Sequence, residues 1–165
     1  KIINKKNYKG ENLGDIKIQS TDNFKSINCP ANLNSSAIDE FLLIFLIAAK
    51  SKGISSFKNL GELNKKESPR LNIAINFLKM IGIKVTRKND DIKIYGKPNL
   101  ELKNSYYIKN FHKDHRIFMM SVIAALTFGG KWKIDDKDSV NTSFPRFLSI
   151  VKKLGGKINW KKKFL

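Results

Sequence analysis

The two halves of the chain repeat one order of features. An acidic residue, an apolar run that ends at glycine, a strand-like stretch, a Pro-Arg pair and a second helical run follow one another twice. The matched positions are Asp39 and Asp114, Gly53 and Gly130, and Pro69-Arg70 and Pro145-Arg146, with an offset of 75 or 76 residues through most of the repeat. Such a repeat predicts two copies of one supersecondary unit, strand–helix–strand–helix–strand.

Apolar periodicity and the Gly and Pro positions place the elements of these units. We expect helices over residues 40–52, 69–82, 115–128 and 142–154, with Asp39 and Asp114 as N-caps and with Pro69 and Pro145 in first turns. Strand patterns cover residues 14–20, 25–30, 54–58, 83–86, 92–95, 106–108, 131–134 and 157–160, and residues 89–91 are typical of a hairpin turn. The run 40–52 is apolar nearly all round, which predicts a buried helix, whereas residues 1–13 are polar and predict no element.

Polar residues gather at the start of each expected helix. They are Asp39, residues 66–70, residues 114–116 and Thr142-Ser143. His115 and Arg116 stand at the positive end of a helix, where a cation is disfavoured unless an anion binds beside it. If the repeat brings these helix starts to a common cleft, they form a site for a multiply anionic small ligand. The plainer alternative is that the two aspartates are ordinary caps and that Lys66 and His115 are ordinary surface residues.

The formal net charge of +18 raises the alternative of a nucleic-acid-binding module. The basic residues are 28 lysines and only four arginines, and they are spread along the whole chain. Nucleic-acid readers rely on arginine and usually cluster their charge. The pattern therefore favours a solvated, lysine-rich surface.

The cellular setting is indicated by cysteine content and hydropathy. Cys29 is the only cysteine, so this chain forms no internal disulfide, which fits a reducing compartment. The longest apolar run, residues 41–49, is shorter than the roughly 20 residues of a membrane span, and no signal peptide is visible. We therefore expect a cytoplasmic protein without a membrane partner. The chain begins at Lys1, inside a basic segment and without a Met, as a piece of a longer protein would.

Four segments at these helix starts resemble the signatures of one enzyme family. Residues 63–70, Leu-Asn-Lys-Lys-Glu-Ser-Pro-Arg, resemble its Leu-Arg-Val-Lys-Glu-Ser-Asp-Arg segment, and the others are Asp114-His115-Arg116, Thr142-Ser143-Phe144-Pro145 and Ile38-Asp39-Glu40. The family is EPSP synthase (3-phosphoshikimate 1-carboxyvinyltransferase), and the resemblance covers residues 10–160. It implies an α/β (α+β) fold of repeated βαβαββ units, the inverted α/β barrel. This chain would hold two units of the C-terminal domain, about 10–97 and 98–165, without the N-terminal domain that binds much of the shikimate 3-phosphate.

The resemblance also implies roles for individual residues. Asp39 matches the residue proposed to take the proton of the shikimate hydroxyl, and Lys66 and Glu67 match the pair proposed for proton delivery to, and removal from, the methylene of phosphoenolpyruvate. Arg70 and Arg116 match arginines that hold the phosphoenolpyruvate carboxylate. The remaining matched positions are His115, which lines the same wall, and Thr142, where some members carry a phosphate-binding lysine. The chemistry requires an acid, a base and fixed cations, but no metal or other cofactor.

Three positions depart from the family pattern, and three alternatives follow. Pro69 replaces a usual Asp, Asn64 replaces a usual Arg, and Thr142 lacks the positive charge of the lysine. The alternatives are a UDP-N-acetylglucosamine enolpyruvyl transferase of the same fold, a non-catalytic remnant of the enzyme, and the basic nucleic-acid-binding module. The Lys-Glu-Ser and Asp-His-Arg segments favour the shikimate enzyme, which we expect to be monomeric when complete.

Overall fold

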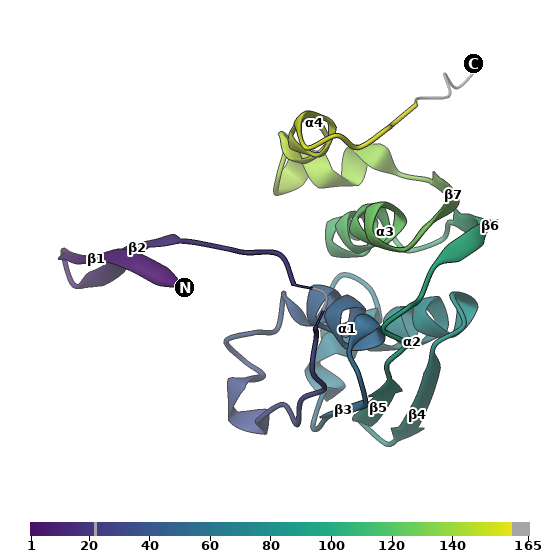
Figure 1. The fold of residues 1–165 in the computed structure, drawn as a ribbon, viewed down its shortest axis with the longest axis horizontal. Coiled ribbons are helices and arrows are strands. Elements are labelled where there is room, and N and C mark those ends of the chain that lie inside the picture. The colour runs from purple at the N-terminus through teal and green to yellow at the C-terminus, as the bar shows by residue number, and fades with distance from the viewer. Residues whose placement is uncertain (22, 160–165) are drawn as a thin grey trace.

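A computed structural model describes residues 1–21 and 23–159 of the chain, and the first repeat unit forms its lower part in Figure 1. This unit contains α1 (Phe41–Lys50), β3 (Ile54–Phe57), α2 (Arg70–Met80), β4 (Lys84–Lys88) and β5 (Asp91–Tyr95). The strand order is β3-β5-β4, with both pairs antiparallel. The expected strand 25–30 makes only two isolated parallel bridges to this region, Lys25 with Lys52 and Asn28 with Ser56.

The second unit repeats the order of the first, but its described residues contain no counterpart of the antiparallel strands β4 and β5. It contains β6 (Leu102–Ile108), α3 (His115–Phe128), β7 (Gly129–Ile134) and α4 (Phe147–Lys153), and β6 pairs with β7 in parallel. In both units a helix therefore connects two parallel chain segments, as the repeat predicts. The expected mixed α/β fold is confirmed.

The core lies where α1, α2 and α3 pack together (Figure 1). Phe41, Phe45 and Phe57 are fully buried, and the ring of Phe57 meets both other rings edge-on. Each such pair adds about 0.5–1.5 kcal/mol to the stabilisation from burial. The first helix is largely buried, as predicted, although Leu43 and Ile47 of α1 are exposed.

A hairpin that the sequence did not predict extends away from this core. Strands β1 (Ile2–Tyr8) and β2 (Glu11–Ile16) pair antiparallel around Lys9 and Gly10, which both have positive φ angles. The expected strand over 14–20 is wrong beyond Ile16. Nearly every residue of the hairpin is exposed, so neither strand carries the alternation of apolar and polar residues that a half-buried strand shows.

Several helix ends differ from the prediction. Asp39 is not the cap of α1: the position before the helix belongs to Glu40, and neither side chain bonds the first turn. Residues 137–142 form a 3₁₀ helix, and α4 begins only at Phe147, because Pro145 has no N–H for a continuous helix. Gly129 and Gly130 begin β7 as well as ending α3. Residues 157–159 form no strand, and Trp160 lies outside the described residues.

Candidate active site

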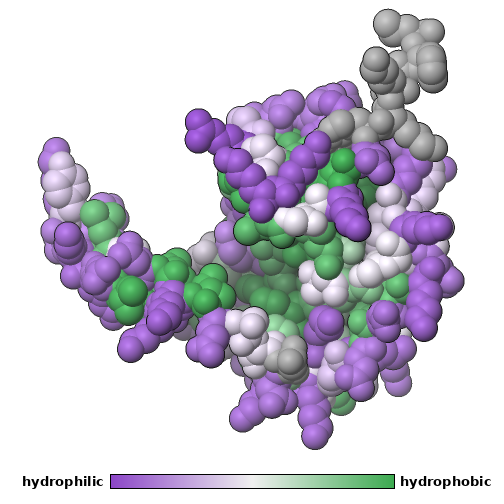
Figure 2. Space-filling view, turned by 45° about the horizontal axis from the view of Figure 1, so that its top comes forward, coloured by the Kyte–Doolittle hydropathy of each residue, from purple (hydrophilic) through white to green (hydrophobic). Residues whose placement is uncertain are grey.

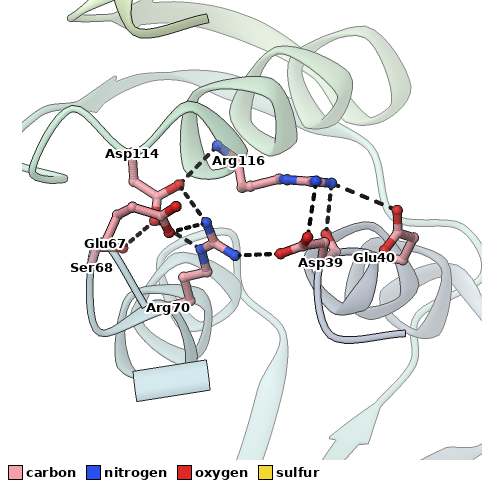
Figure 3. A network of polar contacts seen from close by, with 7 residues as sticks. All are labelled: Asp39, Glu40, Glu67, Ser68, Arg70, Asp114 and Arg116. Carbon is pink, nitrogen blue, oxygen red and sulfur yellow. Dashed lines mark hydrogen bonds and ion pairs between the residues drawn. The ribbon is translucent and has the colours of Figure 1, made fainter. Parts of the chain in front are cut away.

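The guanidinium group of Arg70 is the centre of the polar cluster at the helix starts (Figure 3). Arg70 is the first residue of α2 and is only 2% exposed. Its Nε donates to Oδ2 of Asp114 at 2.9 Å, its Nη1 donates to Oδ1 of Asp39 at 2.9 Å, and its Nη2 pairs with Glu67. Three carboxylates from three segments of the chain therefore surround one buried cation.

Asp114 connects the start of α2 with the start of α3. Its side chain is fully buried and accepts hydrogen bonds from the Ser68 hydroxyl at 2.7 Å and from the backbone N–H of Arg116 at 2.9 Å. The second of these bonds confirms the predicted N-cap. Burial alone would raise the pKa of Asp114, but the bonds from Arg70 and Ser68 outweigh it and lower that pKa.

Arg116 lies on the other side of Asp39 from Arg70 and is less enclosed than Arg70. Its Nη2 lies 3.1 Å from Oδ2 of Asp39, and its Nη1 lies 3.6 Å from Oε1 of Glu40 and 3.3 Å from the Asp39 carbonyl oxygen. Asp39 thus gives one carboxylate oxygen to each arginine (Figure 3). Arg116 remains 29% exposed, and its buried Nε has no hydrogen-bond partner among the described residues.

The predicted convergence of helix starts is therefore confirmed for three helices. The ion pairs join the residues before α1, at the start of α2 and at the start of α3. Among the described residues, no hydrogen bond joins this cluster to the side chains of three other predicted site residues: exposed Lys66, half-buried His115 and exposed Thr142. The Thr142 hydroxyl instead donates to the Ser139 carbonyl at 3.0 Å.

Asn64 is a residue whose role the sequence did not reveal. Pro69 occupies the N-cap position of α2 and offers no side-chain acceptor. Oδ1 of Asn64 accepts the backbone N–H of Asn72 at 3.2 Å, which is the bond that a capping side chain would accept at the third helical residue. Asn72 in turn accepts from Nη1 of Arg87 at 2.6 Å. Two departures from the family pattern, Pro69 and Asn64, thus meet at one helix end.

A large surface hollow lies elsewhere. Its volume is about 470 Å³, and its lining includes Lys50, Glu101 and Phe128, at the far ends of α1 and α3. It contains neither the paired arginines nor a carboxylate cluster, so the helix starts are the better candidate for the functional site.

The described residues include no group of three or more His, Cys, Asp or Glu side chains that could hold a metal ion. None of the helices in that part of the chain has the length and apolar content that a membrane crossing requires.

The cluster can fix an anionic group and exchange protons beside it. Arg116 presents a guanidinium group that is partly exposed. The carboxylates of Asp39 and Glu67 are 41% and 56% exposed, so they can reach a ligand in the cleft. Arg70 is buried among three carboxylates and is less able to bind a ligand directly.

Comparison with known proteins agrees with this chemistry. The EPSP synthase (3-phosphoshikimate 1-carboxyvinyltransferase) family profile matches residues 8–151. The 3-phosphoshikimate 1-carboxyvinyltransferases of Ruthia magnifica and Vesicomyosocius okutanii are 38% and 40% identical, over 96% and 91% of this chain. The chain spans about a third of these relatives, 35% and 34% of their lengths.

Solved structures give the same result. EPSP synthase from Acinetobacter baumannii superposes with a TM-score of 0.88 at 32% identity, covering 98% of this chain and 37% of that protein. An enolpyruvyl transferase from Streptomyces tendae shares the fold, with a TM-score of 0.51 at 16% identity over 73% of this chain and 26% of that protein. The extent of the family match and the identity over nearly the whole chain lead to one conclusion: this chain belongs to the EPSP synthase family.

Proposed function

We propose that this chain is a portion of the C-terminal domain of an enzyme that transfers the enolpyruvyl group of phosphoenolpyruvate to the 5-hydroxyl of shikimate 3-phosphate. The observation that carries the proposal is the cluster of Arg70, Arg116, Asp39 and Glu67 at three convergent helix starts. The two repeat units occupy residues 10–97 and 98–165. The rest of the enzyme, including an N-terminal domain, supplies the remainder of the shikimate 3-phosphate site.

In this proposal the carboxylate of phosphoenolpyruvate binds Arg116, whose guanidinium group is partly exposed. Arg70 completes the cationic side of the site from its buried position. His115, the first residue of α3, lines the same wall, and Thr142 occupies the position where other members use a lysine. Formation of the complex requires Arg116 to exchange part of its contact with Asp39 and Glu40 for the ligand.

The reaction then proceeds by addition and elimination. The shikimate hydroxyl oxygen forms a bond to C2 of phosphoenolpyruvate while Asp39 accepts the hydroxyl proton, and the methylene carbon gains a proton from the Lys66–Glu67 pair. In the second step the C2–O bond to phosphate breaks, the new methyl group returns a proton to that pair, and the departing phosphate takes up the proton that Asp39 had accepted. The products are the enolpyruvyl ether and inorganic phosphate, so all protons and bonds balance without a redox step.

The proposal also covers the setting of the complete enzyme. We expect the complete enzyme to be monomeric. We also expect it to be cytoplasmic, because the single Cys29 fits a reducing compartment. Figure 2 shows hydrophilic residues around most of the rim of the face that it draws, as expected for a solvated lysine-rich surface, and hydrophobic residues at its recessed centre. The reaction belongs to the pathway that leads through shikimate to the aromatic amino acids.

A chimeric enzyme tests the proposal. Residues 1–165 replace the matching third of the Acinetobacter baumannii EPSP synthase, and phosphate release is measured with both substrates present. We expect turnover by the chimera and none by the isolated chain. Glu67→Gln keeps the size of the side chain but cannot shuttle a proton, so it should lower kcat by about 10²–10⁴. A folded chimera without turnover, or a Glu67→Gln variant with the parent kcat, would overturn the proposed function.

A further inference from the structure

We infer that Asp114 is a positioning residue that sets both arginines of the site at once and thereby determines the affinity for the anionic substrate. This inference rests on the proposed function. Asp114 itself does not touch a ligand, since its side chain is fully buried below the cleft. Its effect passes through the guanidinium group of Arg70 and the backbone N–H of Arg116.

The hydrogen bonds of Asp114 account for both of its oxygens. Oδ2 accepts from the Ser68 hydroxyl at 2.7 Å and from Nε of Arg70 at 2.9 Å. Oδ1 accepts from the backbone N–H of Arg116 at 2.9 Å and, at 3.4 Å, from Nη2 of Arg70. A carboxylate offers about four acceptor positions, and all of them are occupied here. One side chain therefore holds Arg70 by its guanidinium group and Arg116 by its backbone.

Charge gives the first reason why this placement matters. Arg70 is buried and needs a counter-ion, because an unpaired buried charge is strongly unfavourable. Of its three carboxylate partners, only Asp114 is fully buried, whereas Asp39 and Glu67 are exposed to the cleft. With Asp114 in place, Arg70 keeps a partner when the other two carboxylates turn to the substrate.

The geometry of α3 gives the second reason. The bond from the Arg116 N–H to Asp114 caps the first turn of this helix. Loss of a cap frays the first turn of a helix. His115 and Arg116 are the first two residues of that turn, so the cap fixes the direction in which the Arg116 side chain crosses the cleft.

Two substitutions separate these contributions in the chimera. Asp114→Asn keeps an oxygen that can accept from the Arg116 N–H, but an amide NH₂ group replaces the oxygen that accepts from Arg70 and Ser68. Asp114→Ala removes both acceptor oxygens. We expect the KM for phosphoenolpyruvate to rise about 10- to 150-fold in Asp114→Asn, with a smaller change in kcat. Asp114→Ala should lose more kcat/KM than Asp114→Asn. The control is Asp138→Asn, an exposed aspartate of the 3₁₀ helix at 137–142, which should behave as the parent.

A second measurement on the 165-residue chain is independent of turnover. Proton exchange is followed by NMR at the Arg70 Nε–H and at the Arg116 amide, the two groups that donate to Asp114. Asp114→Asn should speed exchange at the Arg70 Nε–H about tenfold or more and spare the Arg116 amide, whereas Asp114→Ala should speed both.

The outcomes distinguish the two proposals. An inactive parent chimera would count against the proposed function and leave the exchange data to decide the role of Asp114. Unchanged exchange at both groups would overturn that role. In an active chimera, Asp114→Asn with the parent KM and merely less folded enzyme would also overturn it, because that is the result of a purely structural residue.

Discussion

The first turn of α2 is capped by a residue that is not at the N-cap position, and this capping bond should contribute to the stability of the chain. Pro69 stands at the N-cap position without a side-chain acceptor, and Asn64, eight residues before Asn72, accepts the N–H that the cap would accept. Asn64→Ala should therefore destabilise the parent, because the N–H of Asn72 loses its partner. In a Pro69→Asp background the same change should have little effect, since the aspartate introduced at the N-cap can accept that N–H itself.

The expected changes in the free energy of unfolding follow from the known effects of replacing helix-capping side chains. Replacing a capping side chain by Ala costs about 0.5–2 kcal/mol, and the Asn64 bond is exposed and 3.2 Å long, so we expect about 1 kcal/mol. Pro69→Asp alone should cost about 0.4–1 kcal/mol, because the proline restriction of the unfolded chain is lost while Asn64 already accepts the N–H that the new cap would accept. The coupling between the two positions should therefore be about 0.7–1 kcal/mol.

Urea unfolding of the 165-residue chain, followed by far-ultraviolet circular dichroism, measures this coupling. The double-mutant cycle contains four proteins: the parent, Asn64→Ala, Pro69→Asp and the variant with both changes. They are compared at a common m-value, so that the shift in the urea midpoint gives the change in the free energy of unfolding. Asn32→Ala is the control, because Asn32 is an exposed asparagine in the short 3₁₀ helix Ala31–Leu33. If the effects of Asn64→Ala and Pro69→Asp simply add, Asn64 does not cap α2 and the reasoning is refuted.

The remaining predictions concern charge, the repeat and packing. The pKa of Asp114 is lowered in the folded chain, so the ionised Asp114 contributes to the free energy of unfolding above about pH 4, and this contribution is lost as the pH falls through the folded pKa. The difference in the free energy of unfolding between the parent and Asp114→Asn, measured with urea, should therefore narrow below about pH 4. Arg146 occupies the place of Arg70 in the second unit but is exposed, so Arg146→Ala should leave phosphate release by the chimera nearly intact while Arg70→Ala should not; equal effects would contradict the assigned roles. Gly96→Ala would place a Cβ 1.9 Å from the Ser51 carbonyl oxygen and should destabilise the chain by about 3 kcal/mol in urea unfolding. Random DNA should bind weakly and be released near physiological salt in a fluorescence anisotropy titration, and sub-micromolar affinity there would favour the nucleic-acid-binding alternative.

Much of the fold follows from signals that are local in the sequence. The apolar run after Asp114 predicts α3 together with its cap, and the residues around Asn89 predict the turn between β4 and β5. Hairpin β1–β2 escaped prediction because both of its faces are exposed, which leaves no periodic pattern. The first turn expected at Thr142 was wrong because tight 3₁₀ turns end the segment before Pro145, and such turns leave little trace in hydropathy.

The candidate site was partly predictable for a different reason. The repeat predicts that helix starts converge, so the sequence alone groups Asp39, Arg70 and Arg116. The repeat cannot tell which arginine is enclosed, because Arg70 and Asp114 meet across 44 residues of sequence. The capping role of Asn64 was hidden likewise, since it depends on the spatial approach of its side-chain oxygen to the backbone N–H of Asn72, eight residues along the chain.

On the proposed function, the charges at the helix starts give a reason why this chain would need the rest of the enzyme to bind its substrate. The seven residues of Figure 3 include two arginines and four carboxylates, so the cluster carries more negative than positive charge although the whole chain is strongly basic. A ligand with a carboxylate and a phosphate is repelled by such a cluster unless further cations approach it. Thr142 carries no charge where some relatives place a lysine, and exposed Lys66 is the nearest basic side chain in sequence to Glu67. On the proposed function, the missing positive charge comes from Lys66 and from the part of the enzyme outside this chain. The isolated chain should therefore bind phosphoenolpyruvate far more weakly than the chimera does.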